Sequence, residues 1–442
     1  MNTPICDFVR QYRDAAPLRM HMPGHKGAPL LGPEPLDITE IAGADDLYHA
    51  RGVIRRSEEN AAALFGAART LYSAEGSSLC IRAMVYLATL RGAELGLPRR
   101  LLAGRNAHKT LMTAAALLDL EIDWLSPGDH LLGAGFCVEE LEKRLAERDF
   151  LAVYLTSPDY LGGMADIRRA AAICRRAGTP LMVDNAHGAY LKFLDQDSHP
   201  MTPGAAICCD SAHKTLPCLT GAAYLHIGRS APEGWVDQAE GALALFGSTS
   251  PSWLILQSLD RVNPELAGPF PERLSRMVRR LEGIKKALRG RGWALTGEEP
   301  GKLTLAAKSA GYTGLELGER LRSQGVECEF ADPDFVVLMP SAWTGEEDWN
   351  RLERALENIP LWQPIPAAPP QTAMGEQACT IRQAVLAPRE EIPVERALGR
   401  VLAEAYMGCP PAVPICTAGE RITLQAIQCF QYYGVKTCQV IR

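Results

Sequence analysis

Asp184-Asn185-Ala186-His187-Gly188 and Ser211-Ala212-His213-Lys214-Thr215 are the two most informative stretches of this chain. Each comes just after an apolar run typical of a strand, at 180–183 and at 205–209. Open α/β sheets bind their ligands just beyond the carboxyl ends of their strands. The two stretches therefore predict a site to which one strand end delivers an acid, Asp184, and the next delivers a lysine, Lys214.

An acid and a lysine at neighbouring strand ends are what a pyridoxal 5'-phosphate (PLP) site requires. The lysine forms a Schiff base with the aldehyde, and the carboxylate keeps the pyridine nitrogen protonated so that the ring accepts electrons. The same residues are compatible with a simpler structure, in which Asp184 caps a helix and Lys214 is solvated. The pair alone does not decide between these two interpretations.

The composition is that of a globular protein without a nucleic-acid or membrane partner. The chain has 442 residues, 47% of them hydrophobic, and its net charge of -6 disfavours nucleic acids and anionic membranes. No apolar run reaches the roughly 18 residues of a membrane span, and residues 1–7 lack the features of a signal peptide. The 13 cysteines form no CxxC pair and show no metal-ligand spacing. We therefore expect reduced thiols, no metal site and a cytoplasmic protein.

Apolar runs and amphipathic segments alternate beyond residue 56, as in βαβ units around a parallel sheet. Residues 1–55 are rich in Pro and Gly and predict an extended N-terminal arm. We expect a large domain at 56–263, a small α/β domain at 264–359, a Pro-rich linker at 360–371 and a C-terminal domain at 372–442. The patterns predict strands at 151–155, 180–183, 205–209, 222–227, 302–306 and 335–339, and helices at 58–67, 165–176, 272–289, 313–324 and 394–405.

Hydroxyl-rich turns are the candidates for binding the phosphate of PLP. Gly76-Ser77-Ser78 lies between a possible strand and a helix, and a helix N-terminus is a ready anion site. Most such turns are plain helix caps, so this one is weak evidence alone. Ser211 offers a further hydroxyl three residues before Lys214. The turn at 247–252, with Ser248 and Thr249, is compatible with phosphate binding from a neighbouring subunit.

The cofactor ring also needs neighbours on its two faces. Ala186 is small enough for a flat ring to lie against it, and His108 could stack on the opposite face. An isolated histidine at a strand end is more often structural. Lys26 and Lys109 are rival Schiff-base lysines, but neither is paired with a strand-end acid as Lys214 is.

One motif makes the interpretation specific. His21-Met22-Pro23-Gly24-His25-Lys26-Gly27 resembles the N-terminal signature of the ornithine/lysine/arginine decarboxylase family, which has PLP fold type I. The resemblance implies a mostly parallel seven-stranded sheet flanked by helices, a smaller α/β domain and a C-terminal segment. It implies the short form of the family, without the N-terminal flavodoxin-like wing. The similarity spans nearly the whole chain in the family's order, through 37–40, 45–47, 65–67, 105–109, 156–160, the Asp184 and Lys214 motifs, 249–252, 410–414 and 418–420.

The resemblance also implies roles for the matching residues. Lys214 would be the Schiff-base lysine, Asp184 the pyridine partner and His108 the stacking residue. Four residues would lie near the phosphate, and His187 would lie near the ring or the substrate; the four are Ser77, Ser78, Ser211 and His213. The implied reaction is α-decarboxylation of a basic amino acid, in which Lys214 or a nearby histidine, His187 or His213, returns a proton to Cα.

Five positions depart from the family pattern. The family usually has Asn in place of Glu75, and a carboxylate beside a phosphate is unfavourable unless it points away. Cys80 stands where Gly or Ala is usual, and Asn185 where many members carry an acid. Asp159 and Leu161 replace the commoner Thr and Tyr. These changes affect phosphate contact and substrate fit, whereas the lysine and aspartate chemistry is intact.

A basic substrate requires an acid near its distal cationic group. Glu420 is the first candidate, ahead of Asp46, Glu329 and Asp332, although each is also compatible with a solvated surface position. The sequence does not choose among arginine, lysine and ornithine. Alternatives are another fold-type-I reaction, such as transamination or aldol cleavage, and a catalytically silent regulatory relative. We expect a homodimer or higher homo-oligomer, because fold-type-I sites are usually completed at a dimer interface.

Overall fold

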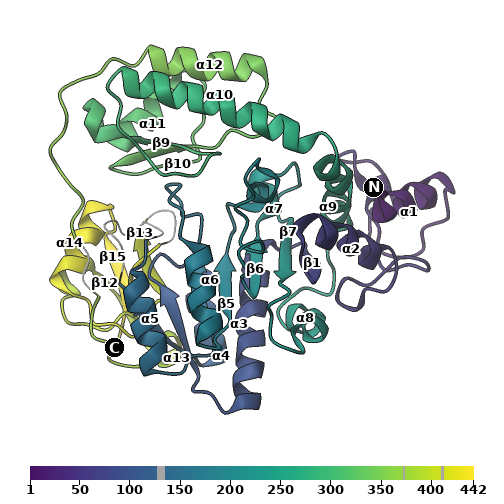
Figure 1. The fold of residues 1–442 in the computed structure, drawn as a ribbon, viewed down its shortest axis with the longest axis horizontal. Helices are drawn as coiled ribbons and strands as arrows, with labels where there is room; N and C mark the ends of the chain where they lie inside the picture. The colour runs from purple at the N-terminus through teal and green to yellow at the C-terminus, as the bar shows by residue number, and fades with distance from the viewer. Residues whose placement is uncertain (127–134, 372–373, 410–412) are drawn as a thin grey trace. The chain divides into compact units, whose positions relative to one another are not determined.

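A seven-stranded, mainly parallel sheet is the central element of the fold (Figure 1). The computed structural model describes residues 1–126, 135–371, 374–409 and 413–442, so motif residues 410–412 lie outside the described residues. The strand order is β1-β7-β6-β5-β4-β2-β3. Parallel pairs are β2/β3, β4/β5 and β5/β6, whereas β7 runs antiparallel to both its neighbours. The strands are β1 (Arg69–Ser73), β2 (Arg100–Gly104), β3 (Glu121–Leu125), β4 (Val153–Thr156), β5 (Leu181–Asp184), β6 (Ile207–Asp210) and β7 (Ala223–Ile227).

Strands β5 and β6 show why the apolar runs of the sequence predicted this sheet. Every residue of both strands is buried. A parallel strand that is covered on both faces forms a continuous apolar run rather than an alternating one. Each of the two strands ends in an aspartate, Asp184 and Asp210, so the first polar side chains stand at the carboxyl edge. The predicted α/β fold is confirmed.

The chain forms two compact units. The first comprises residues 1–98, 149–157 and 166–272, and the second comprises residues 99–148, 158–165 and 273–442. The boundaries expected from the sequence at 55/56, 263/264, 359/360 and 371/372 stay predictions.

The first unit contains strands β1 and β4 to β7 together with a set of helices. The long helix α3 begins one turn beyond β1, which places its N-terminus beside the carboxyl end of that strand. Helix α6 begins where the side chain of Asp166 accepts the backbone N–H of Arg169 at 2.9 Å. The helices are α1 (Pro4–Asp14), α2 (Val53–Phe65), α3 (Gly76–Leu95), α6 (Ile167–Arg176), α7 (Ala212–Thr215), α8 (Trp235–Ala244) and α9 (Trp253–Ala267).

The second unit contains a four-stranded antiparallel sheet of order β10-β11-β9-β8. Its strands are β8 (Leu295–Thr296), β9 (Leu303–Ala306), β10 (Phe330–Ala331) and β11 (Phe335–Leu338). Figure 1 shows α10, α11 and α12 beside this sheet, in green. These helices are α10 (Phe270–Gly290), which belongs to this unit from residue 273 on, α11 (Gly314–Ser323) and α12 (Glu346–Glu357). The unit also contains strands β2 and β3, together with α4 (Lys109–Leu118) and α5 (Val138–Glu147).

The C-terminal segment is built on two small antiparallel sheets, and here one prediction is wrong. The helix expected at 394–405 is a single 3-10 turn, Val394–Arg396. Gly399 takes a φ of 72°, which ends the helical path, and Leu402 donates its N–H across to Glu420 O at 3.0 Å. The elements are α13 (Ile381–Leu386), β12 (Arg389–Pro393), β13 (Tyr406–Cys409), β14 (Val413–Thr417), α14 (Leu424–Tyr432) and β15 (Thr437–Ile441), with pairs β12/β15 and β13/β14.

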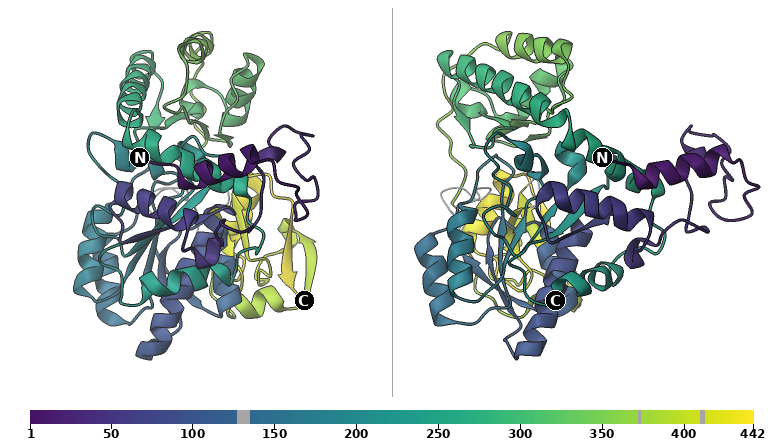
Figure 2. Two further views of the ribbon diagram at one scale, coloured as in Figure 1. Left: turned by 90° about the vertical axis from the view of Figure 1, so that its right-hand side faces the viewer. Right: turned by 45° about the vertical axis from the view of Figure 1, so that its right-hand side comes forward.

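The N-terminal arm is also more ordered than expected. Residues 4–14 form α1, whereas the sequence predicted an extended segment throughout 1–55 (Figure 2). The helix is anchored because the N–H of Cys6 donates to Asp260 Oδ2 of α9 at 2.9 Å. Beyond it, Leu18 and Leu31 are 86% and 91% exposed. Among the residues described, no helix combines the length and apolarity that a membrane crossing needs.

Candidate active site

Lys214 and His187 meet at the sheet edge where Asp184 ends β5. β5 and β6 pair in parallel, with Asp184 opposite Cys209, so the two strands end side by side. Lys214 follows β6 in the short helix α7, and its Nζ lies 3.0 Å from Nε2 of His187. The His187 side chain lies three residues beyond Asp184 and is buried. One edge of the first unit thus carries a lysine, a histidine and a carboxylate.

Asp184 is a buried carboxylate that accepts hydrogen bonds from three donors. Its Oδ2 accepts the hydroxyl of Tyr154 at 3.0 Å, and its Oδ1 accepts the N–H of Ala186 at 3.2 Å and the thiol of Cys209 at 3.8 Å. Burial, and then the Asp184 carboxylate, raise the pKa of Tyr154 well above its ordinary value, so the phenol keeps its proton and donates. These contacts fix the orientation of Asp184. Asp184 is therefore more than a helix cap, whereas Lys214 is exposed, as the simpler interpretation expected.

Three of the residues predicted to bind the phosphate, Ser77, Ser78 and Ser211, lie at the N-terminus of α3. Ser211 donates its hydroxyl to Ser77 Oγ at 2.8 Å, which joins the end of β6 to the first turn of α3. Gly76 has a φ of 72°, and its N–H donates to Gly221 O at 2.7 Å. The side chain of Glu75, the N-cap residue of this 20-residue helix, makes no capping hydrogen bond. Ser78 follows in the same first turn.

His213 and Ala186 border the same edge. The Nδ1 of His213 lies 2.9 Å from the carbonyl oxygen of Ala222, so this nitrogen carries a proton and donates it. Ala186 offers a small, partly exposed side chain immediately after Asn185. Of the rival lysines, Lys26 donates to His21 O within the arm, and Lys109 is the first residue of α4.

The turn at 247–252 makes contacts within its own unit. The N–H of Ser248 donates to Glu75 Oε1 at 2.7 Å, and Ser248 Oγ accepts the N–H of Ser250 at 3.2 Å. Thr249 is exposed. Ser248 therefore shapes the turn and fixes it to the residue that precedes α3.

In the second unit, His108 is the N-cap of α4. Its Nδ1 accepts the N–H of Thr110 at 3.3 Å and lies 2.9 Å from the Thr110 hydroxyl, which fixes the plane of the ring. Three residues earlier, Arg105 forms a buried ion pair with Glu420, the first candidate for binding the substrate cation. The stacking role of His108 stays a prediction.

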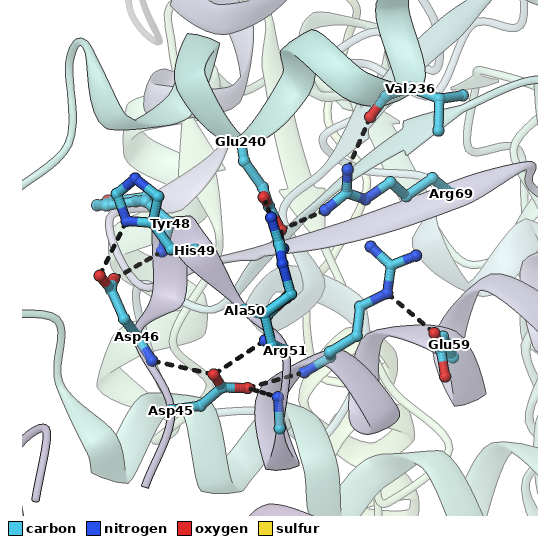
Figure 3. Close-up of polar contacts among 12 residues, drawn as sticks. Asp45, Asp46, Tyr48, His49, Ala50, Arg51, Glu59, Arg69, Val236 and Glu240 are labelled. Atoms are coloured by element: carbon cyan, nitrogen blue, oxygen red, sulfur yellow. Dashed lines mark hydrogen bonds and ion pairs between the residues drawn. The ribbon is translucent and has the colours of Figure 1, made fainter.

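The other three acids proposed for substrate binding have partners of their own. Asp46 accepts the N–H of Tyr48 at 3.0 Å, and its Oδ2 lies 2.9 Å from Nδ1 of His49 (Figure 3). Glu329 accepts the hydroxyl of Tyr160 at 2.8 Å. Asp332 is buried, and burial raises its pKa to about 6. Asp46 and Glu329 are the more exposed of the three.

Asn185 belongs to a buried polar network behind Asp184. Its Nδ2 donates to Asp210 Oδ1 at 2.7 Å, while Asp210 Oδ2 accepts Nε2–H of His199 at 3.0 Å and of His226 at 3.1 Å. Burial alone would raise the pKa of Asp210, but the two histidines hold it well below its ordinary value. His199, Cys208 and Asp210 carry possible metal-ligand atoms within 4.8 Å of one another. Three donors already reach Asp210, so both of its carboxylate oxygens have hydrogen-bond partners.

The three remaining departures from the family pattern are buried in the structure: Cys80, Asp159 and Leu161. Cys80 lies fully buried in the second turn of α3, and burial raises the pKa of its thiol well above the ordinary value. Asp159 accepts the N–H of Gly163 at 2.7 Å and is buried, and Leu161 belongs to a hydrophobic core of the second unit.

Sequence reasoning missed Tyr154 and Asp210. Tyr154 lies on β4 opposite Met182, two residues before Asp184, so a parallel register would have pointed to it. Asp210 ends an apolar strand just as Asp184 does, and this repeated position was the available signal.

Comparisons with known proteins agree with this arrangement. Residues 3–305 match the family model described as "Orn/Lys/Arg decarboxylase, major domain". An arginine decarboxylase from Bacillus subtilis is 30% identical, with 96% of this chain and 92% of that protein covered. The structure resembles the constitutive lysine decarboxylase of E. coli (TM-score 0.77, 19% identity, 100% of this chain and 82% of that one). It also resembles the lysine decarboxylase of Francisella novicida (TM-score 0.80, 15% identity, 100% and 81%). The chain belongs to the Orn/Lys/Arg decarboxylase family and has PLP fold type I.

Proposed function

We propose that this chain decarboxylates arginine, with PLP held between Lys214 and Asp184. Family membership makes the chain a decarboxylase of a basic amino acid. Arginine is the first choice because the relative at 30% identity is named an arginine decarboxylase. The main structural support is the 3.0 Å contact between Lys214 Nζ and His187 Nε2, on the sheet edge that also carries the buried Asp184.

The side chains at this sheet edge are suited to the pyridine nitrogen, the aldehyde and the phosphate of PLP. Asp184 offers a buried, oriented carboxylate to the pyridine nitrogen, and Lys214 offers an amine to the aldehyde. The Ser77 and Ser211 hydroxyls, linked at 2.8 Å, stand at the start of α3, where a phosphate is favoured. Bound PLP would accept the electron pair released when the bond between Cα and the carboxylate breaks.

His187 and Lys214 provide the route for a proton. Their shared hydrogen bond lets a proton pass between Nζ and Nε2, and either atom could then return it to Cα. His187 is buried, whereas Lys214 is exposed, so the histidine is the shielded partner of this pair. His213 donates from Nδ1 to Ala222 O, so its ring is held in place beside Lys214.

The acid that binds the guanidinium of the substrate is best sought at Asp46 or Glu329. Glu420 is neutralised by Arg105, and Asp332 uses Oδ1 to accept the N–H groups of Asp334 and Phe335. Asp46 and Glu329 keep more of their surface exposed to solvent. This ranking replaces the order expected from the sequence.

We also infer a homodimer in the cytoplasm that supplies amine to polyamine synthesis. The exposed Leu18, Leu30 and Leu31 of the N-terminal arm, each more than 80% exposed, are apolar surface that a second copy would cover. Cysteines in the described part of the chain form no disulfide, which suits a reducing compartment. Light scattering of the purified protein tests the dimer.

The deciding experiment is incubation of the PLP-loaded protein with arginine, lysine and ornithine separately. CO₂ together with agmatine is the expected result with arginine. Lys214→Ala should abolish both turnover and the visible absorbance of lysine-bound PLP. A keto acid or glycine as product would instead indicate transamination or aldol cleavage. PLP binding without any product would support the regulatory alternative.

A further inference from the structure

Glu75 places a negative charge directly before α3, whose first turn we propose binds the coenzyme phosphate. Acids near a helix N-terminus are favourable for the helix, but here the same end must also attract a phosphate. Glu75 is the N-cap residue of α3, yet its side chain does not cap the helix. The charge therefore needs a separate explanation.

The side chain of Glu75 binds a turn instead. Its Oε1 accepts the N–H of Ser248 at 2.7 Å and the hydroxyl of Tyr48 at 3.4 Å. Burial, followed by the neighbouring Glu75, raises the pKa of Tyr48, so the phenol keeps its proton and acts as the donor. A Cβ on Gly247 would lie 1.9 Å from Tyr48 Oη, which shows how closely the turn packs on this ring.

Both partners of Glu75 are held in place by their own elements. In the loop of Figure 3, Asp45 accepts the N–H of Arg51 at 3.0 Å and of Gly52 at 2.7 Å, and so fixes the segment that carries Tyr48. On the other side, Arg51 and Arg69 both bind Glu240 of α8, the helix that leads to Ser248. Glu75 is thus kept close to α3 and is not free to swing away.

We propose that Glu75 sets the coenzyme affinity of this enzyme, weakening phosphate binding by charge repulsion in exchange for a fixed turn at 247–252. The inference rests on the proposed function, because it takes the start of α3 as the phosphate site. Glu75 is exposed, so solvent and salt screen much of the repulsion. We expect removal of this partly screened charge to change the affinity for phosphate by about three- to tenfold.

The test is the variant Glu75→Gln, which removes the charge but keeps an oxygen to accept the Ser248 N–H. Apo-protein is titrated with PLP at low and at high salt, and separately with pyridoxal, which lacks the phosphate. The dissociation constant for PLP should fall about three- to tenfold at low salt, and the gain should shrink at high salt. The affinity for pyridoxal should not change. Tyr48→Phe is the matched control, because it removes one contact of Glu75 and leaves the charge.

Two results would overturn the inference. One is unchanged or weaker PLP binding by Glu75→Gln, which would make Glu75 a structural tether only. The other is an equal gain for pyridoxal, which would separate the effect from the phosphate. The proposed function fails differently, through a wild-type protein that binds no PLP. In that case calorimetry with inorganic phosphate still tests the role of Glu75. The inference then requires Glu75→Gln to bind phosphate more tightly than wild type does.

Discussion

Arg105 and Glu420, 315 positions apart in the chain, form a bidentate ion pair with both side chains buried. Nη1 lies 2.7 Å from Oε1, and Nη2 lies 2.9 Å from Oε2. The guanidinium also stacks 4.8 Å from the Trp124 ring centre and donates to Ile415 O at 3.2 Å. The pair joins the turn that carries His108 to the C-terminal segment. The C-terminal segment therefore helps to shape the motif at 105–109.

Glu420→Gln should destabilise the protein strongly, because it leaves the Arg105 guanidinium buried without a counter-charge. Breaking such a pair costs about 3–5 kcal/mol. The check is the temperature of unfolding, with Glu376→Gln as control. Glu376 pairs with Arg421 at 3.3 Å, but both side chains are at least half exposed, so its loss should cost about 1 kcal/mol or less. A stable Glu420→Gln protein with a raised KM for arginine would restore Glu420 as the substrate acid.

Tyr154→Phe should lower kcat while leaving the fold intact, because Asp184 loses the donor that orients Oδ2. We expect a fall of roughly tenfold or more, the usual scale for a positioning hydrogen bond at a reacting group. Circular dichroism of bound PLP reports the orientation of the ring and should change as well. Tyr224→Phe is the matched control, since this buried hydroxyl has no hydrogen-bond partner among the described residues. Equal losses in both variants would assign Tyr154 a purely structural role.

The sequence predicted β5 and β6 well because these strands are short apolar runs that end in polar residues. The strand expected at 205–209 is β6, Ile207–Asp210, and that at 180–183 is β5, Leu181–Asp184. Both differ by one residue at the carboxyl end, where a buried aspartate still completes the strand. The helix at 394–405 failed because its apolar residues pack into a β-rich core, and Gly399 bends the chain midway.

The site was only half predictable for a related reason. Lys214, Asp184 and His187 lie in two local motifs, so the sequence placed them without knowledge of tertiary contacts. The role of Glu420 depends on Arg105, and that of Glu75 depends on Ser248, 173 positions away. Such partners are set by packing between distant elements. A local sequence pattern therefore does not predict which residue pairs with Glu420 or with Glu75.

Asn185→Asp should destabilise the protein in a way that depends on pH. Asn185 Nδ2 donates to Asp210 Oδ1 at 2.7 Å, so the variant places two buried carboxylates in contact. One must stay protonated, which raises its folded pKa above the unfolded value. The deficit against wild type should therefore be small at pH 4 and grow as the pH rises to 8, where it reaches about 3 kcal/mol or more. Thermal unfolding at both pH values checks this, and a deficit that does not vary with pH would contradict it.

Asp332→Asn should stabilise the protein above pH 6 and have little effect below pH 4. Burial raises the pKa of Asp332 to about 6 from 3.8, although the N–H groups of Phe335 and Asp334 oppose the shift. A folded pKa above the unfolded one means that stability is present at low pH and is lost as the pH rises through the folded value.

The amide keeps Oδ1 to accept the two N–H groups, at 2.6 and 2.8 Å, and replaces Oδ2, which has no hydrogen-bond partner among the described residues. The gain at pH 8 is at most about 3 kcal/mol, and thermal unfolding at pH 8 and pH 4 measures it. Glu329→Gln is the control, because this exposed acid should leave the unfolding temperature unchanged at both pH values. A larger stability gain of Asp332→Asn over wild type at pH 4 than at pH 8 would contradict this prediction. It would show that Asp332 is ionised in the folded protein at neutral pH with no loss of stability. An unchanged KM for arginine in Asp332→Asn would at the same time remove this acid from the substrate site.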